Sequence, residues 1–138
     1  MHTISNWNES VSFTVTDGNI KSPASVSEIQ ATVKDAAAKN LPIKVYGATH
    51  STTACFEGSG ISISLRKMAK ILSIDKEKLT VTVQAGVTLH ELVNHLKPLG
   101  FQPPVILEMG PYHIGAISGT HANDTSVTRG THNSRHIA

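Results

Sequence analysis

"VYGATHSTTACFEGSG", residues 45–60, places a Gly, a His and a run of small hydroxyl side chains directly after a β-branched segment. The run "IKVYG" (43–47) predicts a strand that delivers this loop at its carboxyl end. Glycine lets a backbone approach a ligand closely, and hydroxyls and amides donate hydrogen bonds to anionic oxygens. Three interpretations of the loop are therefore open: a phosphate site, a catalytic histidine site, and an ordinary polar turn.

The residues before this loop predict a strand and a helix. "VSFTVT" (11–16) alternates apolar and polar residues, which is typical of a short half-buried strand. "SPASVSEIQATVKDAAAKNLP" (22–42) predicts a helix capped by Ser25 or Ser27 and stopped by Asn40 and Pro42. We expect its apolar stripe to pack on a sheet, through Val26, Ile29, Val33 and Ala37.

Three further strands and a second helix follow the loop. The strands are predicted over 60–65, 70–75 and 79–86, and the last two flank the charged turn "DKEK". Thr88 is the expected cap of the helix in "LHELVNHLKPLG" (89–100), whose apolar stripe is Leu89, Leu92, Val93 and Leu96.

Regular patterning fades after Phe101. The segment 103–130 is rich in Gly, Ser, Thr and Pro but keeps apolar residues, so we interpret it as an ordered binding loop followed by a short strand or turn. The order of elements predicts an α+β fold: a small mixed sheet with helices on one side.

Composition narrows the class of partner and the compartment. The 12 basic and 10 acidic residues are scattered, and aromatic residues make up only 4% of the chain, so a nucleic-acid partner is not expected. Cys55 is the single cysteine, which excludes an internal disulfide, and we interpret it as a small, partly buried hydrophobic residue. Without a leader-like or membrane-spanning segment, the sequence predicts a soluble, cytoplasmic protein.

Two segments, "YGATHSTT" (46–53) and "GAISGTHANDTS" (115–126), together predict the two walls of a pyrophosphate site. Neither is a Walker loop or a Gly-x-Gly-x-x-Gly fingerprint. The histidines do not predict a metal site, because His90 and His95 are five residues apart on the second helix and carry no partners at ligand spacing. A serine nucleophile is also not indicated, because Ser51 adjoins His50 in sequence and no Gly-x-Ser-x-Gly elbow is present.

Taken in order, these motifs resemble a known family over residues 7–130. The series runs from "PASVSEI" (23–29) through "GATHS" (47–51) and "TVTVQAGVTLHEL" (80–92) to "GAISGTHANDT" (115–125). It is similar to the amino-terminal part of the FAD-binding domain of the vanillyl-alcohol oxidase and p-cresol methylhydroxylase superfamily. The nearest branch is the sugar-lactone (gulonolactone and arabinonolactone) and alditol oxidases.

The resemblance implies FAD as cofactor and a partial FAD-binding domain over 1–130, followed by a frayed tail over 131–138. In such domains the first loop wraps the FAD pyrophosphate, and in many members the His at the position of His50 bonds covalently to the flavin ring. The residues implied to contact the cofactor are Tyr46, Gly47, Ala48, Thr49, His50, Ser51, Thr52, Gly110, Gly115, Ser118, Gly119, Thr120 and His121.

Three features depart from the family pattern. Thr49 stands where Gly is usual, which narrows the backbone freedom of the loop but leaves its amide as a donor. The second motif is one residue shorter before Ser118 than in many relatives. Family members also continue beyond the position of Ala138 into further strands and a substrate domain, so we expect a truncated flavin oxidase without full oxidase activity of its own.

A different class of function stays open at this point. Without its cofactor, the predicted pyrophosphate site would leave a cleft, which could serve a cofactor-free cyclase or isomerase. His50, Tyr112 and His121 are then the acid and base candidates, because His titrates near neutral pH and Tyr can donate a proton. The cleft could also serve a noncatalytic interaction module binding a partner or small molecule. An exposed sheet edge further predicts a homo-oligomer.

Overall fold

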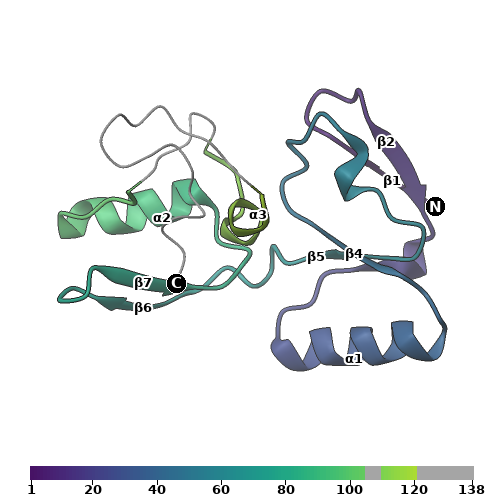
Figure 1. Ribbon diagram of the computed structural model, residues 1–138, viewed down its shortest axis with the longest axis horizontal. Helices are drawn as coiled ribbons and strands as arrows, with labels where there is room; N and C mark the ends of the chain where they lie inside the picture. Colours follow the sequence, from purple (N-terminus) through teal and green to yellow (C-terminus); the bar gives the residue numbers. More distant parts are fainter. Residues whose placement is uncertain (105–109, 121–138) are drawn as a thin grey trace. The chain divides into compact units, whose positions relative to one another are not determined.

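The computed structural model describes residues 1–104 and 110–120. The chain is divided into two compact units, Met1–Met68 and Ala69–Ala138 (Figure 1). Within the described ranges, no helix combines the length and apolar character needed to cross a membrane.

The first unit contains two small sheets. Strands β1 (His2–Ser5) and β2 (Ser12–Val15) form an antiparallel hairpin. Strands β3 (Ile20–Lys21), β4 (Ile43–Tyr46) and β5 (Ile61–Ser64) form a parallel sheet in the order β3-β5-β4. The predicted strands over 11–16, 43–47 and 60–65 are confirmed, whereas β1 and β3 were not predicted, because neither short segment shows a clear alternation.

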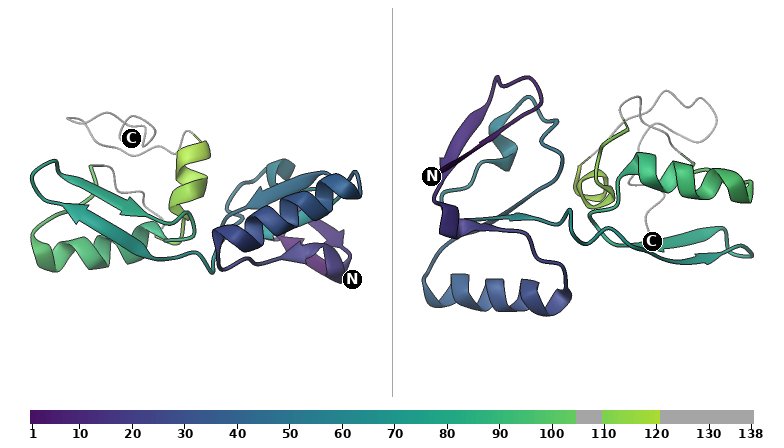
Figure 2. Two further views of the ribbon diagram at one scale, coloured as in Figure 1. Left: turned by 90° about the horizontal axis from the view of Figure 1, so that it is seen from below. Right: turned by 180° about the vertical axis from the view of Figure 1, so that it is seen from behind.

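Helix α1 (Val26–Ala38) covers one face of the parallel sheet, and the β1–β2 hairpin covers the other (Figures 1 and 2). On the helix side Ala36 packs with Ile61 and Ile63. On the hairpin side a second cluster contains Ile4, Phe13, Val15 and Phe56. The central strand β5 is therefore buried on both faces, and even the Ser62 side chain is fully buried.

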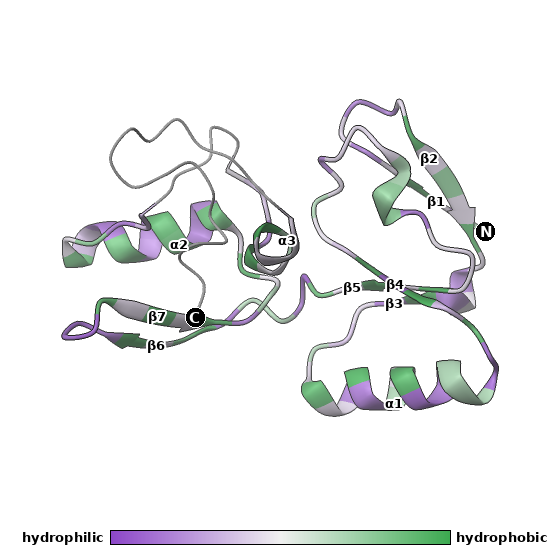
Figure 3. Ribbon diagram, viewed as in Figure 1, coloured by the Kyte–Doolittle hydropathy of each residue, from purple (hydrophilic) through white to green (hydrophobic). Residues whose placement is uncertain are grey.

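The cap of α1 is confirmed, but its predicted apolar stripe is partly wrong. The Ser25 hydroxyl accepts a hydrogen bond from the Glu28 amide, as expected for an N-cap. Val26 and Val33, in contrast, are 61% and 46% exposed, and Ala36 is the buried residue of the helix. Hydrophobic and polar residues alternate along the whole of α1 (Figure 3). The sequence pattern of this helix is therefore compatible with more than one buried face. The small Ala36 side chain allows the helix to lie close to the sheet.

The second unit combines a β-hairpin with two helices. Strands β6 (Ile71–Asp75) and β7 (Thr80–Val83) pair antiparallel, as predicted. Helix α2 (Leu89–Leu96) buries its predicted stripe, with Leu92 and Leu96 packed together with Val87. A 3-10 turn over Lys97–Leu99 then ends at Gly100, whose φ of +80° suits a residue without a side chain.

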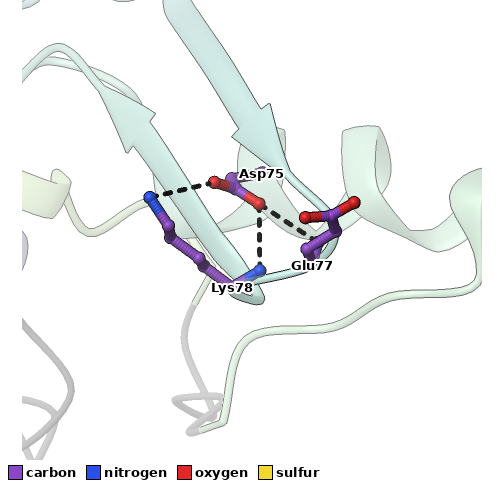
Figure 4. Close-up of polar contacts among 3 residues, drawn as sticks. All are labelled: Asp75, Glu77 and Lys78. Carbon is purple, nitrogen blue, oxygen red and sulfur yellow. Dashed lines mark hydrogen bonds and ion pairs between the residues drawn. The ribbon is translucent and has the colours of Figure 1, made fainter.

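The charged turn between β6 and β7 is organised by one carboxylate. Asp75 Oδ1 accepts hydrogen bonds from the Glu77 and Lys78 amides at 3.1 and 2.9 Å (Figure 4). The other oxygen of Asp75 lies 3.7 Å from the Lys78 ammonium group. These contacts explain why the charged residues predicted as a turn close the hairpin.

Residues 114–119 form a helix, α3 (Ile114–Gly119), where a loop followed by a strand or turn was predicted. The Gly and Ser content favoured a loop, but Ile114 and Ile117 lie three residues apart and pack with Leu89 of α2. The α+β class is confirmed, with the strands distributed over three small sheets. The predicted tail over 131–138 lies outside the described residues.

Candidate functional site

The loop that follows β4 is held in place through its carbonyl groups. The Thr49 carbonyl accepts a hydrogen bond from the Trp7 amide at 3.2 Å. The Ser51 carbonyl accepts one from the side-chain amide of Asn6 at 3.0 Å. Thr49 has a φ of +52°, a left-handed conformation that is strained for a β-branched residue. The position where Gly is usual in the resembling family is thus one where the backbone favours Gly.

Four backbone amides of the same loop make no hydrogen bond with the part of the chain that the structure describes. Within residues 1–104 and 110–120, the backbone N–H groups of Ala48, Thr49, Ser51 and Thr52 donate to no described acceptor. Successive free N–H groups in a turn with a left-handed residue form a concave site for anionic oxygens. The loop therefore fits a pyrophosphate, because the Thr49 and Ser51 carbonyls accept hydrogen bonds from the protein while these four amides donate to no described residue.

His50 lies in the middle of this loop and is partly buried, with its Nδ1 atom covered by protein. Tyr46 precedes the loop and packs against the cluster around Phe13 and Phe56. Burial raises the pKa of the Tyr46 phenol, and a hydrogen bond with Ser64 opposes that effect. The Tyr46 ring thus contributes to the core of the first unit.

Cys55 lies just beyond the loop and is exposed, so the prediction of a partly buried residue is wrong. A hydrogen bond with the Ser51 side chain is the main cause that lowers the pKa of the Cys55 thiol; Thr53 and the charge of Lys44 add to it. The Ser51 and Thr53 hydroxyls lie 3.0 Å apart, so the three side chains form one polar cluster. This cluster was not predicted, because its residues are small and lie in an irregular segment.

The second predicted segment uses its backbone groups differently. The Gly110 and Tyr112 carbonyls accept hydrogen bonds from the His90 and Leu89 amides of α2. The Gly115 amide donates to the Ala85 carbonyl, and a side chain at Gly115 would come within 2.8 Å of the Ala85 side chain. Gly115 thus allows α3 to lie close to the chain that leaves β7.

The remaining predicted residues of this segment lie on or beside α3. The Ser118 and Thr120 hydroxyls donate to the Ile114 and Ala116 carbonyls, which leaves each oxygen able to accept. Gly119 is exposed, and Tyr112 is partly buried against Leu89 and Ile117. His121 lies outside the described residues. The cofactor and acid–base roles of all these residues stay predictions.

Sequence reasoning missed Asn6, Trp7 and His113. Asn6 is only 3% exposed and holds the first loop, whereas Trp7 is 57% exposed and contributes its backbone amide. His113 is 7% exposed and pairs with Thr88 in an isolated β-bridge. The only signal for Asn6 was a turn-forming residue beside a strand. In the described part of the chain, no group of three or more His, Cys, Asp or Glu residues could hold a metal ion.

Comparison with known proteins gives one family. Residues 19–135 match the model of the FAD binding domain. The chain is 32% identical over 125 residues to the mitochondrial L-galactono-1,4-lactone dehydrogenase of Arabidopsis thaliana. This match covers 91% of this chain and 20% of the relative. It is also 31% identical over 108 residues to L-gulonolactone oxidase of Mus musculus. That match covers 78% of this chain and 24% of the relative.

A solved structure supports the same fold. Alkyldihydroxyacetonephosphate synthase superposes with a TM-score of 0.73 at 24% identity, over 81% of this chain and 22% of that protein. The chain spans about a fifth to a quarter of the length of these relatives. The predicted resemblance to flavin-dependent sugar-lactone enzymes is confirmed, and FAD is the cofactor that it supports. With the family model matched from residue 19 to residue 135, the chain belongs to the family of FAD binding domains.

Proposed function

We propose that this chain binds FAD through its pyrophosphate at residues 47–53. The proposal is supported by the N–H groups of Ala48, Thr49, Ser51 and Thr52, which donate to no acceptor among the described residues. Hydrogen bonds from backbone amides to anionic oxygens are charge-assisted and stronger than neutral ones. The first turn of α2 offers no comparable site, because the Leu89, His90 and Glu91 amides already donate to protein oxygens.

The bound flavin would accept a hydride from substrate, and that chemistry belongs to the cofactor. The chain's own contribution is to bind and orient the cofactor through the loop after β4. By analogy with the lactone enzymes, we propose that the flavin serves oxidation of an alcohol carbon in a sugar or sugar lactone, with O₂ as the oxidant. In the second unit, the exposed Ser118, Gly119 and Thr120 stay predicted cofactor contacts from the family resemblance.

His50 is the proposed residue for covalent attachment of the flavin, because it lies among the loop amides. The absorbance of the purified protein between about 350 and 500 nm, before and after acid precipitation, tests both proposals. Flavin that stays with the precipitate from the wild type and is released from His50→Ala indicates attachment through His50. His95→Ala, at an exposed position of α2, is the matched control and should behave as the wild type.

Other outcomes separate the proposals. Flavin that is released from the wild type by acid would overturn the attachment and leave the noncovalent site. A colourless protein that takes up no added FAD would overturn the flavin proposal itself. That result would favour the cofactor-free cyclase, isomerase or interaction module.

A further inference from the structure

The residues that hold the candidate pyrophosphate loop come from the turn between β1 and β2. The model of the FAD binding domain matches the chain only from residue 19 onward, so this turn lies outside the matched segment. Asn6 is 3% exposed although its side chain is polar. Buried polar side chains in folded proteins are almost always hydrogen-bonded, so the partners of Asn6 indicate its role.

Each polar atom of the Asn6 side chain has a partner. Its Nδ2 atom donates to the Ser51 carbonyl at 3.0 Å and to the Ser10 hydroxyl at 3.1 Å. Its Oδ1 atom accepts from the Val11 amide at 3.1 Å. One side chain therefore fixes the turn of its own hairpin and, 45 positions away in sequence, the loop after β4.

The neighbouring residue makes a second contact with the same loop. The Trp7 amide donates to the carbonyl of Thr49, the residue in the left-handed conformation. Such a conformation of a β-branched residue persists only where the surroundings impose it. The two bonds hold the Thr49 and Ser51 carbonyls against the hairpin, on either side of His50.

We propose that Asn6 is a positioning residue for FAD binding. Together with the Trp7 amide, it keeps Thr49 in its left-handed conformation and so presents the amides of Ala48, Thr49, Ser51 and Thr52 to the pyrophosphate. The inference rests on the proposed function, because it assigns Asn6 to the same site. An unconstrained loop would have to be ordered when the ligand binds, which lowers affinity.

Asn6→Asp tests this role with a minimal change. It keeps an oxygen that can accept from Val11, and the Ser10 hydroxyl can donate to the new oxygen in place of Asn8. The group facing the Ser51 carbonyl, however, becomes an acceptor. Asn8→Asp is the matched control, since Asn8 is exposed in the same turn and its Oδ1 atom accepts hydrogen bonds from Ser10, which an aspartate oxygen can also accept. Should Asn6→Asp fail to fold by circular dichroism, Asn6→Ser removes the reach to Ser51 without adding a buried charge.

FAD affinity is measured by equilibrium dialysis on protein made by cell-free synthesis without flavin. We expect Asn6→Asp to bind FAD about tenfold more weakly, because the Ser51 carbonyl loses the Asn6 amide that donates to it. Asn8→Asp should stay within about twofold of the wild type, as an exposed change. In a Thr49→Gly background, Asn6→Asp should cost less than about threefold, because Gly holds the left-handed conformation without help. A merely structural role of Asn6 predicts the same loss in both backgrounds.

A ligand-free measurement tests the hairpin contact separately. Hydrogen exchange of the Trp7 amide, followed by NMR, should be slow in the wild type and in Asn8→Asp, and about tenfold faster or more in Asn6→Asp. If the wild type takes up no FAD, the proposed function fails and the positioning role fails with it. If the wild type binds FAD and Asn6→Asp binds equally well, or loses equal affinity with and without Thr49→Gly, only the positioning role is overturned.

Discussion

Thr49 is the one residue of the loop after β4 whose backbone is strained by a left-handed conformation. Its φ of +52° places a β-branched side chain in a region where L-residues are destabilised by roughly 1–2 kcal/mol. The neighbouring loop residues do not share this conformation, since the described non-Gly residues with positive φ are Glu9, Asn40, Thr49 and Leu79. The loop therefore has one position where removing a side chain should help the fold.

Thr49→Gly should raise the free energy of unfolding by about 1 kcal/mol, because relief of left-handed strain exceeds the added entropy of Gly in the unfolded chain. Urea unfolding followed by circular dichroism measures the change. Thr52→Gly is the control: Thr52 is exposed in the same loop without a positive φ, so it should lose stability. Equal losses for the two variants would refute the strain at Thr49.

Cys55 provides a second test at the scale of a single residue. Its thiol pKa is lowered, first by the hydrogen bond with Ser51, so the thiolate persists to lower pH than in an ordinary thiol. The rate of alkylation by iodoacetamide should therefore rise with pH at a lower midpoint than for free cysteine. Ser51→Ala should move the midpoint upward, and Thr53→Ala should move it less. A midpoint unchanged in Ser51→Ala would contradict the assignment of the cause.

At the scale of elements, the start of α2 was the clearest prediction from sequence. Thr88 and Glu91 form a capping box, in which the Thr88 hydroxyl accepts from the Glu91 amide and the Glu91 carboxylate accepts from the Thr88 amide. Both residues are readable from the pattern Thr-x-x-Glu before an apolar stripe. Helix α3 was missed because its position depends on Gly115 packing against Ala85, a contact that no local pattern encodes.

Thr88→Ala should lower the free energy of unfolding by about 1–2 kcal/mol, because it leaves the Glu91 amide without its cap. Thr88→Ser keeps the hydroxyl and should lose much less. Urea unfolding of both variants gives the comparison. Equal losses would show that the Thr88 methyl group, buried with its residue, matters more than the cap.

At the scale of the whole molecule, the sequence carried the class of the fold and the family. The ordered series of short motifs could be matched to a known domain although each motif alone was ambiguous, and the family model covers residues 19–135. The role of Asn6 could not be predicted, because its bond to Ser51 joins residues 45 positions apart. The burial of Ser62 could not be predicted either, since it depends on α1 and the β1–β2 hairpin packing on the two faces of β5.

Self-association stays a prediction at this scale. Among the described residues, strands β3 and β4 are the edges of the three-stranded sheet, and a sheet edge can pair with another chain. Light scattering over a range of concentrations should show a mass above 14.7 kDa that increases with concentration. Val45→Lys, at a 52% exposed position of β4, should reduce the association. A monomer at all concentrations would refute it.

The binding of FAD, ADP and riboflavin to flavin-free protein from cell-free synthesis, compared in one titration, tests whether the loop after β4 binds the pyrophosphate of FAD. ADP shares the pyrophosphate of FAD, whereas riboflavin has the flavin ring and no phosphate. If the amides of Ala48, Thr49, Ser51 and Thr52 bind the pyrophosphate, FAD should bind and ADP should compete with it for one site. Riboflavin should bind at least about tenfold more weakly, since charge-assisted hydrogen bonds supply much of the affinity. Riboflavin binding as tight as that of FAD, or no binding of FAD at all, would show that these amides do not bind the pyrophosphate.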